Sequence, residues 1–345
     1  MAGPGLRLAI RIQDALYGMR ASWGRRAGRV PTVVPFIGYG GEGWIRVLGR
    51  VVLRKPGRAP ADRFTSVRGW RSFTSIPARD AAVTVTAGDA TGVVRADRGG
   101  VIDARFEVDL SPGWSTVRLS VDGHDGVDFP VFVVDPAAAF GVVSDVDDTV
   151  MVTALPRPFL AAWNSFVLDE HARTPVAGMA VLYERLVRAH PDAPVVYLST
   201  GAWNVVPTLT RFLSRNLYPR GPLLLTDWGP NHERWFRSGP EHKRISLERL
   251  ANEFPGIRWL LIGDDGQHDE RIYGDFARRH PEHVRAVAIR RLTPGEAVLA
   301  GGRAPASERG RETVPWVYAP DGAGLSAQLD ELGLLTPPNT GETRP

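Results

Sequence analysis

The second half of the chain alternates short apolar runs with stretches of helical periodicity, and this alternation constrains the fold more than any other feature. After Pro136 the apolar runs are FGVVS, PVVYLS, GPLLLT, RWLLIG and VRAVAI. Helical patterns accompany them around residues 157–170, 178–190, 204–215, 242–254 and 269–280. A repeat of strands and helices predicts an α/β domain, a parallel sheet with helices on both faces. In such sheets the chemistry gathers at the carboxyl ends of the strands.

Residues 32–135 show a different pattern, with short runs rich in Val, Ile, Phe and Thr between Gly and Asp turns. The runs are TVVPFI, WIRVLGRVVLRK, AAVTVTA, VIDARFEVDL, TVRLSV and VDFPVFVV, and they predict an antiparallel β-sandwich. Residues 56–80 break the spacing, and we expect a loop with one helical turn there. Gly38, Gly40 and Gly43 spell GxGxxG, but a strand-like run follows where a dinucleotide site requires a helix. We therefore interpret these glycines as a hairpin loop.

Composition excludes several classes of protein. The 345 residues include no cysteine, which rules out disulfide scaffolds, Cys-ligated zinc, iron–sulfur clusters and thiol nucleophiles. No apolar run approaches the length of a membrane span, and Arg7 and Arg11 interrupt the N-terminal apolar stretch where a signal peptide needs its core. The expected location is the cytoplasm.

Positive charge is concentrated at the N-terminus. Residues 1–30 contain six arginines against Asp14, a net charge of +5, whereas the whole chain carries +4. The remaining chain is almost neutral, which argues against a nucleic-acid partner. Apolar residues recur at helical spacing through residues 6–20, the pattern of a basic amphipathic helix. We expect either peripheral contact with the inner membrane surface through residues 1–30 or packing of this helix on its own protein.

Acidic residues follow the first strand of the second half, in the segment Ser144-Asp145-Val146-Asp147-Asp148-Thr149. Three carboxylates in four residues require a metal ion or a shared proton when they are buried. Alternation in an extended segment would place Asp145 and Asp147 on the same side. Asp148 and Thr149 also suit an ordinary turn or helix cap, but Asp145, directly after a buried strand, does not.

Three further segments lie where they could complete a phosphate site. Ser199 and Thr200 follow the second strand, where they could grip a phosphate or simply cap a helix. Lys243, one of two lysines in the chain, opens a predicted helix and could neutralise a phosphoryl oxygen. The fourth strand ends in GDDGQHD, in which Asp264 and Asp269 could complete the oxygen shell of Mg²⁺.

The order of these motifs resembles that of the haloacid dehalogenase superfamily of phosphatases. Receiver domains combine similar residues, but their lysine ends a late strand and no acidic motif follows it. The chain is similar to the phosphatidate phosphatase family of the actin-patch-protein type. The resemblance rests on three segments that follow a β-rich domain: FGVVSDVDDTV, VVYLST and LLIGDDGQHDERIYGDFARRHP. Two positions depart from that family: Thr200 stands where it has Asn, and Asp265 where it has Ser.

The resemblance implies a role for each matching residue. Asp145 would be the nucleophile and Asp147 the general acid and base. Mg²⁺ would be held by Asp145, the main-chain carbonyl of Asp147 and Asp264, with Asp269 either binding the metal or orienting its ligands. The sequence does not show whether Asp265 or Asp269 lies nearer the metal. Phosphoryl binding would fall to Ser199, Thr200 and Lys243.

These inferences predict a Mg²⁺-dependent phosphatidate phosphatase that acts through an aspartyl phosphate. The alternatives are a phosphatase of a protein or soluble phosphoester, and a lipid- or partner-binding protein with secondary catalysis. Only 44 residues separate Thr149 from the second strand, too few for a large cap domain, and an open site suits a bulky or membrane-embedded substrate. The loop before Lys243 contains Trp228, Trp235 and Phe236 and is called the aromatic loop below. It could lie at a lipid interface or be packed by its own aromatic side chains.

Four regions are expected along the chain, and the sequence does not indicate an oligomeric state. They are an N-terminal helix and linker (1–31), a β-sandwich (32–135), a catalytic domain of the haloacid dehalogenase type (136–300) and a C-terminal extension with a flexible tail (301–345).

Overall fold

The structure is a computed structural model, and it describes residues 18–19, 22–55, 76–121, 124–152, 174–226, 239–266, 268–299, 302 and 314–336. Four predicted segments lie wholly or mostly outside the described residues. They are the N-terminal helix at 6–20, the loop at 56–75, the helix at 157–170 and the aromatic loop at 227–238. The chain divides into two compact units: Met1–Pro136, Ser199–Arg211 and Gly221–Ile245 in one, and Ala137–Leu198, Phe212–Arg220 and Ser246–Pro345 in the other.

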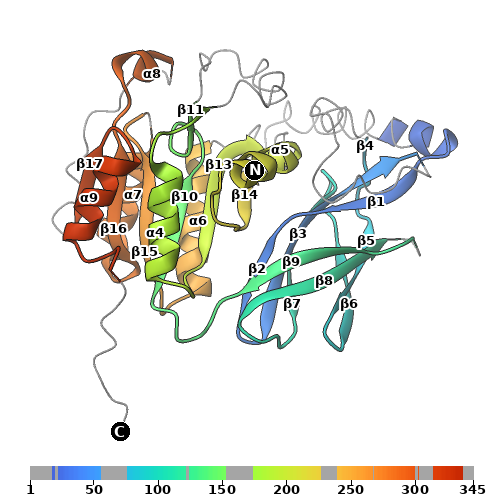
Figure 1. The fold of residues 1–345 in the computed structure, drawn as a ribbon. Coiled ribbons are helices and arrows are strands. Elements are labelled where there is room, and N and C mark those ends of the chain that lie inside the picture. The colour runs from blue at the N-terminus through green and yellow to red at the C-terminus, as the bar shows by residue number, and fades with distance from the viewer. Residues whose placement is uncertain are drawn as a thin grey trace, which may run out of the picture. The chain divides into compact units, whose positions relative to one another are not determined.

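The first region is β-rich, and each of the six predicted runs forms a strand (Figure 1). Its strands are β1 (Val30–Pro35), β2 (Gly38–Gly41), β3 (Trp44–Arg54), β4 (Ile76–Pro77), β5 (Ala82–Ala87), β6 (Ala90–Arg95), β7 (Val101–Glu107), β8 (Gly113–Val121) and β9 (Val127–Val133). They form one connected sheet in the order β1-β3-β2-β9-β8-β5-β6, with β4 and β7 also paired to β3. Pairing is antiparallel except between β2 and β9. The two-sheet sandwich stays a prediction.

Alternating apolar residues from these strands fill one core. Along β5, Val83, Val85 and Ala87 are buried while the residues between them are not, as expected for a strand with one face inward. Val117, Leu119 and Val121 do the same along β8 and belong to the same cluster.

The glycine motif forms a hairpin, as the sequence analysis expected. Gly38–Gly41 is strand β2, which pairs antiparallel with β3, and Gly43 has φ +76° in the turn between them. At Gly40 a Cβ atom would lie within 3.0 Å of Ile45, so close approach of the two strands also requires glycine.

The second sheet is the predicted parallel one. Its order is β14-β13-β10-β15-β16-β17, formed by β10 (Phe140–Asp145), β13 (Val195–Ala202), β14 (Leu223–Thr226), β15 (Arg258–Asp264), β16 (Val284–Arg290) and β17 (Trp316–Ala319). The pairs from β13 through β10, β15 and β16 to β17 are all parallel. The helices are α4 (Met179–Ala189), α5 (Val206–Arg215), α6 (Gly239–Glu253), α7 (Asp269–Arg279), α8 (Pro294–Leu299) and α9 (Gly322–Glu331), with 3₁₀ turns at Trp203–Val205 and Pro281–His283.

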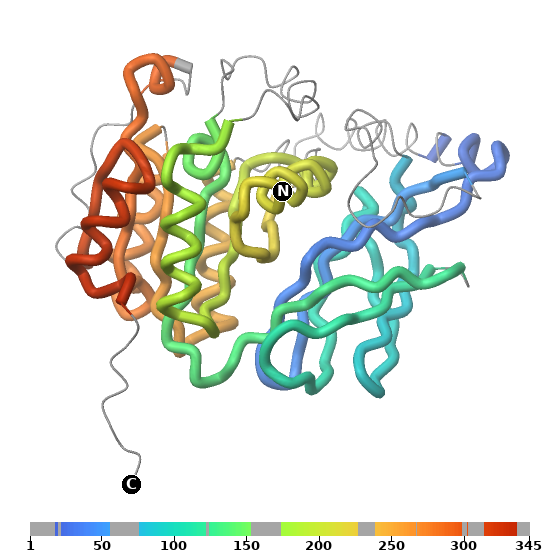
Figure 2. The backbone as a smooth tube through the Cα atoms, in the orientation of Figure 1, coloured from blue at the N-terminus to red at the C-terminus, as the bar shows by residue number. Residues whose placement is uncertain are grey.

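Helices cover both faces of this sheet. Figures 1 and 2 show α4 and α9 side by side on one face and α6 and α7 on the other. This mixed α/β arrangement with a parallel sheet confirms the predicted fold class at that level. Among the described residues, no helix is long and apolar enough to cross a membrane.

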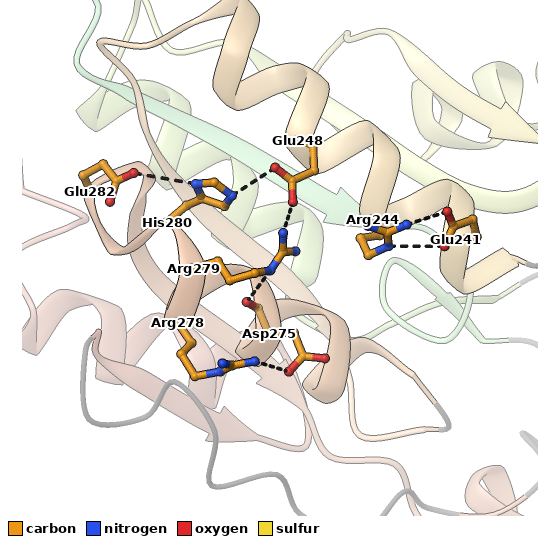
Figure 3. Close-up of polar contacts among 8 residues, drawn as sticks. All are labelled: Glu241, Arg244, Glu248, Asp275, Arg278, Arg279, His280 and Glu282. Carbon is orange, nitrogen blue, oxygen red and sulfur yellow. Dashed lines mark hydrogen bonds and ion pairs between the residues drawn. The ribbon is translucent and has the colours of Figure 1, made fainter.

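A charged network joins α6 to the end of α7 (Figure 3). Glu248 on α6 pairs with Arg279, and its other oxygen lies 3.0 Å from Nε2 of His280. Glu282 lies 3.7 Å from the same imidazole. These contacts fix the end of α7, whose first residue is Asp269.

The edge strand β17 and helix α9 were not foreseen. β17 pairs in register with β16, from Val287 opposite Trp316 to Arg290 opposite Ala319. Leu325 and Leu329 of α9 are fully buried. Residues 316–336 therefore complete the sheet that the sequence analysis had treated as ending before residue 301.

Candidate active site

Two carboxylates lie at the carboxyl ends of neighbouring parallel strands. Asp145 is the last residue of β10 and Asp264 the last of β15, and these strands pair with Ser144 opposite Ile262. Asp269 begins α7 just beyond β15. Side-chain oxygens of the three residues lie within 4.8 Å of one another, and each residue is at most 4% exposed. The structure thus brings together Asp145, Asp264 and Asp269.

Two glycines leave room for these carboxylates. A Cβ atom on Gly263 would lie 2.6 Å from Oδ2 of Asp269 and 2.7 Å from the ring of Tyr273. The main-chain amide of Gly266 donates to Oδ1 of Asp264 over 2.6 Å, which fixes the orientation of that carboxylate. The sequence analysis included both glycines in the motif GDDGQHD but assigned them no role.

The electrostatics of the cluster favour a cation. Burial, together with the charges of Asp269, Asp145 and Asp264, raises the pKa of Tyr273 well above its ordinary value. Tyr273 therefore stays protonated and donates to the carbonyl of Ile262 over 3.2 Å. Three buried carboxylates so close together need a compensating positive charge or shared protons. Because carboxylate oxygens are the ligands that Mg²⁺ prefers, these residues fit a hard divalent ion.

The segment after Asp145 turns away from the strand. Val150 donates its amide to the carbonyl of Val146 over 3.1 Å, and Asp148, with φ +59°, donates to the carbonyl of Met151 over 2.9 Å. Strand β10 ends at Asp145, Asp147 forms an isolated bridge with Met151, and the positive φ comes one residue later, at Asp148. That Asp145 and Asp147 lie on the same side stays a prediction. Asp147 is partly buried in this turn, and its side chain is not part of the three-carboxylate cluster.

Other contacts hold the ends of this turn. The Thr149 hydroxyl donates to Oδ2 of Asp145 over 3.4 Å, and the Tyr218 hydroxyl donates to the carbonyl of Val150 over 2.8 Å. Ser144 forms a short hydrogen bond with the buried hydroxyl of Tyr183 and donates to the carbonyl of Asp145 over 2.7 Å. Asp145 is thus held by its neighbours before any ligand binds.

Comparison with known proteins agrees with this geometry. Residues 140–291, which contain the whole cluster, match the family model described as phosphatidate phosphatase APP1, catalytic domain. Residues 140–291 therefore resemble the catalytic domain of the APP1 family. The family assignment made from the sequence is confirmed, and the family's name is that of a phosphoric monoester hydrolase, the expected enzyme class.

Relatives of this APP1-type domain were found among curated proteins. Phosphatidate phosphatase APP1 of Saccharomyces cerevisiae is 24% identical over 192 residues, which cover 54% of this chain and 32% of that protein. An uncharacterized protein of Schizosaccharomyces pombe is 25% identical over 151 residues, which cover 43% of this chain and 24% of that protein. The match therefore spans about a third or less of these relatives.

Solved structures resemble the chain only distantly. The HAD domain of effector protein Lem4 from Legionella pneumophila aligns with 48% of this chain and 92% of that domain, at 14% identity and a TM-score of 0.30. An uncharacterized protein from Listeria monocytogenes serotype 4b aligns with 56% of this chain and 98% of its own, at 12% identity and a TM-score of 0.36. At these scores neither decides the fold.

Within the APP1-type domain, the structure separates Asp265 from Asp269. Oδ1 of Asp265 accepts a hydrogen bond from the amide of Leu292 over 2.8 Å, whereas Asp269 belongs to the carboxylate cluster. Of the two acidic residues considered as the nearer neighbour of the metal, Asp269 is the one in the cluster.

The predicted phosphate-binding residues lie on two other elements of the domain. Ser199 follows Leu198, the residue of β13 that pairs with Asp145, and its buried Oγ accepts from the amide of Gly201 over 3.0 Å. Thr200 is exposed. Lys243 lies in the first half of α6 and is 5% exposed, an unusual degree of burial for a lysine. The roles of these three residues stay predictions.

Proposed function

We propose that this chain is a Mg²⁺-dependent phosphatase of the haloacid dehalogenase type that converts phosphatidate to diacylglycerol and phosphate. The observation that carries the proposal is the buried cluster of Asp145, Asp264 and Asp269 inside the region that matches the APP1 catalytic family. The same region contains Asp147, Ser199, Thr200 and Lys243 in the order of the family's motifs.

The proposed residues divide the reaction into two steps. An oxygen of Asp145 attacks phosphorus as the bond to the glycerol oxygen breaks, and Asp147 donates the proton that this leaving oxygen needs. Asp147 then takes a proton from the water that attacks the aspartyl phosphate, which releases phosphate and restores Asp145. Ser199, Thr200 and Lys243 bind the oxygens of the transferred group.

The metal would be held by the carboxylates of Asp145, Asp264 and Asp269 and the main-chain carbonyl of Asp147. When bound, Mg²⁺ would supply positive charge for the phosphoryl oxygens and for the carboxylates themselves.

Phosphatidate requires access to a membrane, and we propose that the N-terminal segment provides it. Met19 and Trp23 are 61% and 64% exposed, and Arg25 and Arg26 are also exposed. Gly24 between them is buried against the side chains of Leu53 and Ile76, which docks the segment while Trp23 faces outward. Aromatic and basic groups together suit a membrane surface of anionic lipids.

The deciding experiment measures phosphate release from phosphatidate in mixed micelles and from a panel of soluble phosphoesters, with and without Mg²⁺. Asp145→Asn tests the nucleophile, and Asp330→Asn, a half-exposed residue paired with Arg185, is the matched control. Mg²⁺-dependent release from phosphatidate that only Asp145→Asn abolishes supports the proposal. Release from soluble esters alone would leave the mechanism and remove the lipid substrate, and no release from any ester would favour a lipid- or partner-binding role.

A further inference from the structure

Arg290 is a buried arginine at the carboxyl edge of the parallel sheet. It is the last residue of β16, it is opposite Asp264 of β15 in the strand register, and it is 5% exposed. A guanidinium at such a position keeps its charge and must find partners for its donors. The mechanism proposed above does not use it.

Three separate segments receive hydrogen bonds from this side chain. Nη1 donates to the carbonyl of Asp148 over 2.8 Å, Nη2 pairs with Glu296 of α8 over 2.6 Å, and Nε donates to the carbonyl of Pro320 over 3.2 Å. The planar guanidinium can satisfy three acceptors in fixed directions, which a lysine cannot do. Arg290 thus joins the turn after β10 to α8 and to the connection between β17 and α9.

The contact with Asp148 matters because of the backbone conformation there. Asp148 has φ +59°, a conformation that costs free energy for a residue with a side chain and persists only where the surroundings hold it. The amide of Asp148 is held by the Met151 carbonyl and its carbonyl by Arg290. Asp147 directly precedes this residue, so its direction follows from how the turn is held.

We propose that Arg290 is a positioning residue that holds the Asp147–Asp148 turn in the conformation required for proton transfer. Through Pro320 it ties this turn to residues 316–336, which lie beyond the region that matches the catalytic family. The inference rests on the proposed phosphatase activity of the same site.

The test replaces Arg290 with methionine, which keeps length without donors, and with lysine. Arg258→Met is the matched control, because Arg258 donates to the carbonyl of Val284 over 3.1 Å at the opposite end of β15. The enzyme is assayed at saturating Mg²⁺ on an alkyl phosphomonoester, whose leaving oxygen needs the proton that Asp147 donates, and well below the unfolding temperature of each variant. Hydrogen exchange of the amides at residues 146–151 is measured in parallel.

We expect Arg290→Met to lower kcat by roughly ten- to a hundredfold, the range for a misplaced catalytic group, while KM changes by less than about threefold. Exchange in the 146–151 turn should accelerate, Arg290→Lys should lie between methionine and the parent, and Arg258→Met should resemble the parent. Because a smaller folded fraction would also lower the apparent kcat at unchanged KM, each rate is divided by the folded fraction measured by circular dichroism at the assay temperature.

Retention of the parental kcat and turn exchange in folded Arg290→Met would overturn the inference. If that variant does not fold, Arg290→Lys decides: parental kcat and exchange would overturn the inference, and slower turnover with faster exchange would support it. If the parent itself hydrolyses no phosphomonoester, the proposed function fails, and the positioning of the reaction by Arg290 fails with it. If the parent is active but hydrogen exchange at residues 146–151 is unchanged in the Arg290 variants, the positioning role of Arg290 is rejected and the proposed function stands.

Discussion

Asp265 turns its carboxylate to the main-chain amide of Leu292, which donates to Oδ1 over 2.8 Å. Its neighbour Asp264 instead joins the buried carboxylate cluster. Adjacent aspartates at the end of β15 therefore have different surroundings, one linking the end of β15 to the segment after β16 and one facing the proposed metal.

This difference predicts that substitution of Asp265 affects stability, whereas substitution of Asp264 affects the Mg²⁺ requirement. Asp265→Ala should lower the free energy of unfolding by about 1–2 kcal/mol, because the amide of Leu292 loses its acceptor, and should leave the Mg²⁺ requirement unchanged. Asp264→Asn should raise the Mg²⁺ concentration for half-maximal activity by about tenfold or more. Urea unfolding and Mg²⁺ titration of activity measure the two effects. An equal rise in the Mg²⁺ requirement for both variants would contradict the assignment.

Gly263 offers a way to disturb the cluster without removing a carboxylate. Gly263→Ala would place a methyl group against Oδ2 of Asp269 and the ring of Tyr273, so we expect Asp269 to shift and Mg²⁺ activation to weaken by about tenfold. Gly256→Ala is the control, since nothing lies within 4 Å of its added methyl group. Mg²⁺ titrations of both variants make the comparison. Equal activation of the two would show that the close packing at Gly263 is unimportant.

Glu296 gives stability a pH dependence. Burial alone would raise the pKa of Glu296, but hydrogen bonds from Arg290 and Thr293 outweigh it and lower this pKa below the ordinary 4.5. The folded state therefore favours the carboxylate, and its contribution is present above the unfolded pKa and is lost as pH falls through the lower folded pKa.

Urea unfolding of the parent and Glu296→Gln at pH 7 and at several values below 4.5 tests this sign. We expect the difference in unfolding free energy to be largest at pH 7 and to shrink toward acid pH. Glu184→Gln, which removes an exposed pair with Arg188, should cost less than about 1 kcal/mol at every pH. A difference for Glu296→Gln that grows as the pH falls would refute the linkage.

The sequence predicts the carboxylate site better than the turn beside it. Asp145 and Asp264 could be found because both follow apolar runs, and parallel strands place their carboxyl ends at one edge. The turn that follows Asp147 could not be found, because nothing in the sequence indicates that Asp148 adopts a positive φ. Arginine spacing carries no periodic signal, so nothing along the chain marks Arg290 as the residue that reaches this turn.

The proposed membrane contact predicts a role for the exposed side chain of Trp23 in vesicle binding. Trp23→Ala should weaken binding to vesicles of phosphatidate and phosphatidylcholine by about tenfold, equivalent to about 1.4 kcal/mol, because an interfacial aromatic side chain is lost. Trp114→Ala, which removes a 46% exposed tryptophan packed on Phe132, is the control. Vesicle co-sedimentation measures binding, and hydrolysis of a soluble phosphoester should be unchanged in both. Equal loss of binding in the two variants would reject a specific role for Trp23.

The C-terminal strand predicts where the chain can be shortened. A chain ending at residue 300 lacks β17 and α9, so it exposes the edge of β16 and the surface that Leu325 and Leu329 cover. Exposed strand edges and apolar faces promote aggregation, and we expect this chain to be insoluble.

A chain ending at residue 336 keeps both elements and is the matched control, so it should unfold at the same temperature as the full chain. Soluble yield and thermal unfolding measure the comparison. The family match ends at residue 291, so a chain cut near there tests whether the matched region suffices. Cooperative unfolding of the 300-residue chain at the parental temperature would show that β17 and α9 are dispensable. Because Arg290 donates to the carbonyl of Pro320, loss of these elements also removes one of its three acceptors.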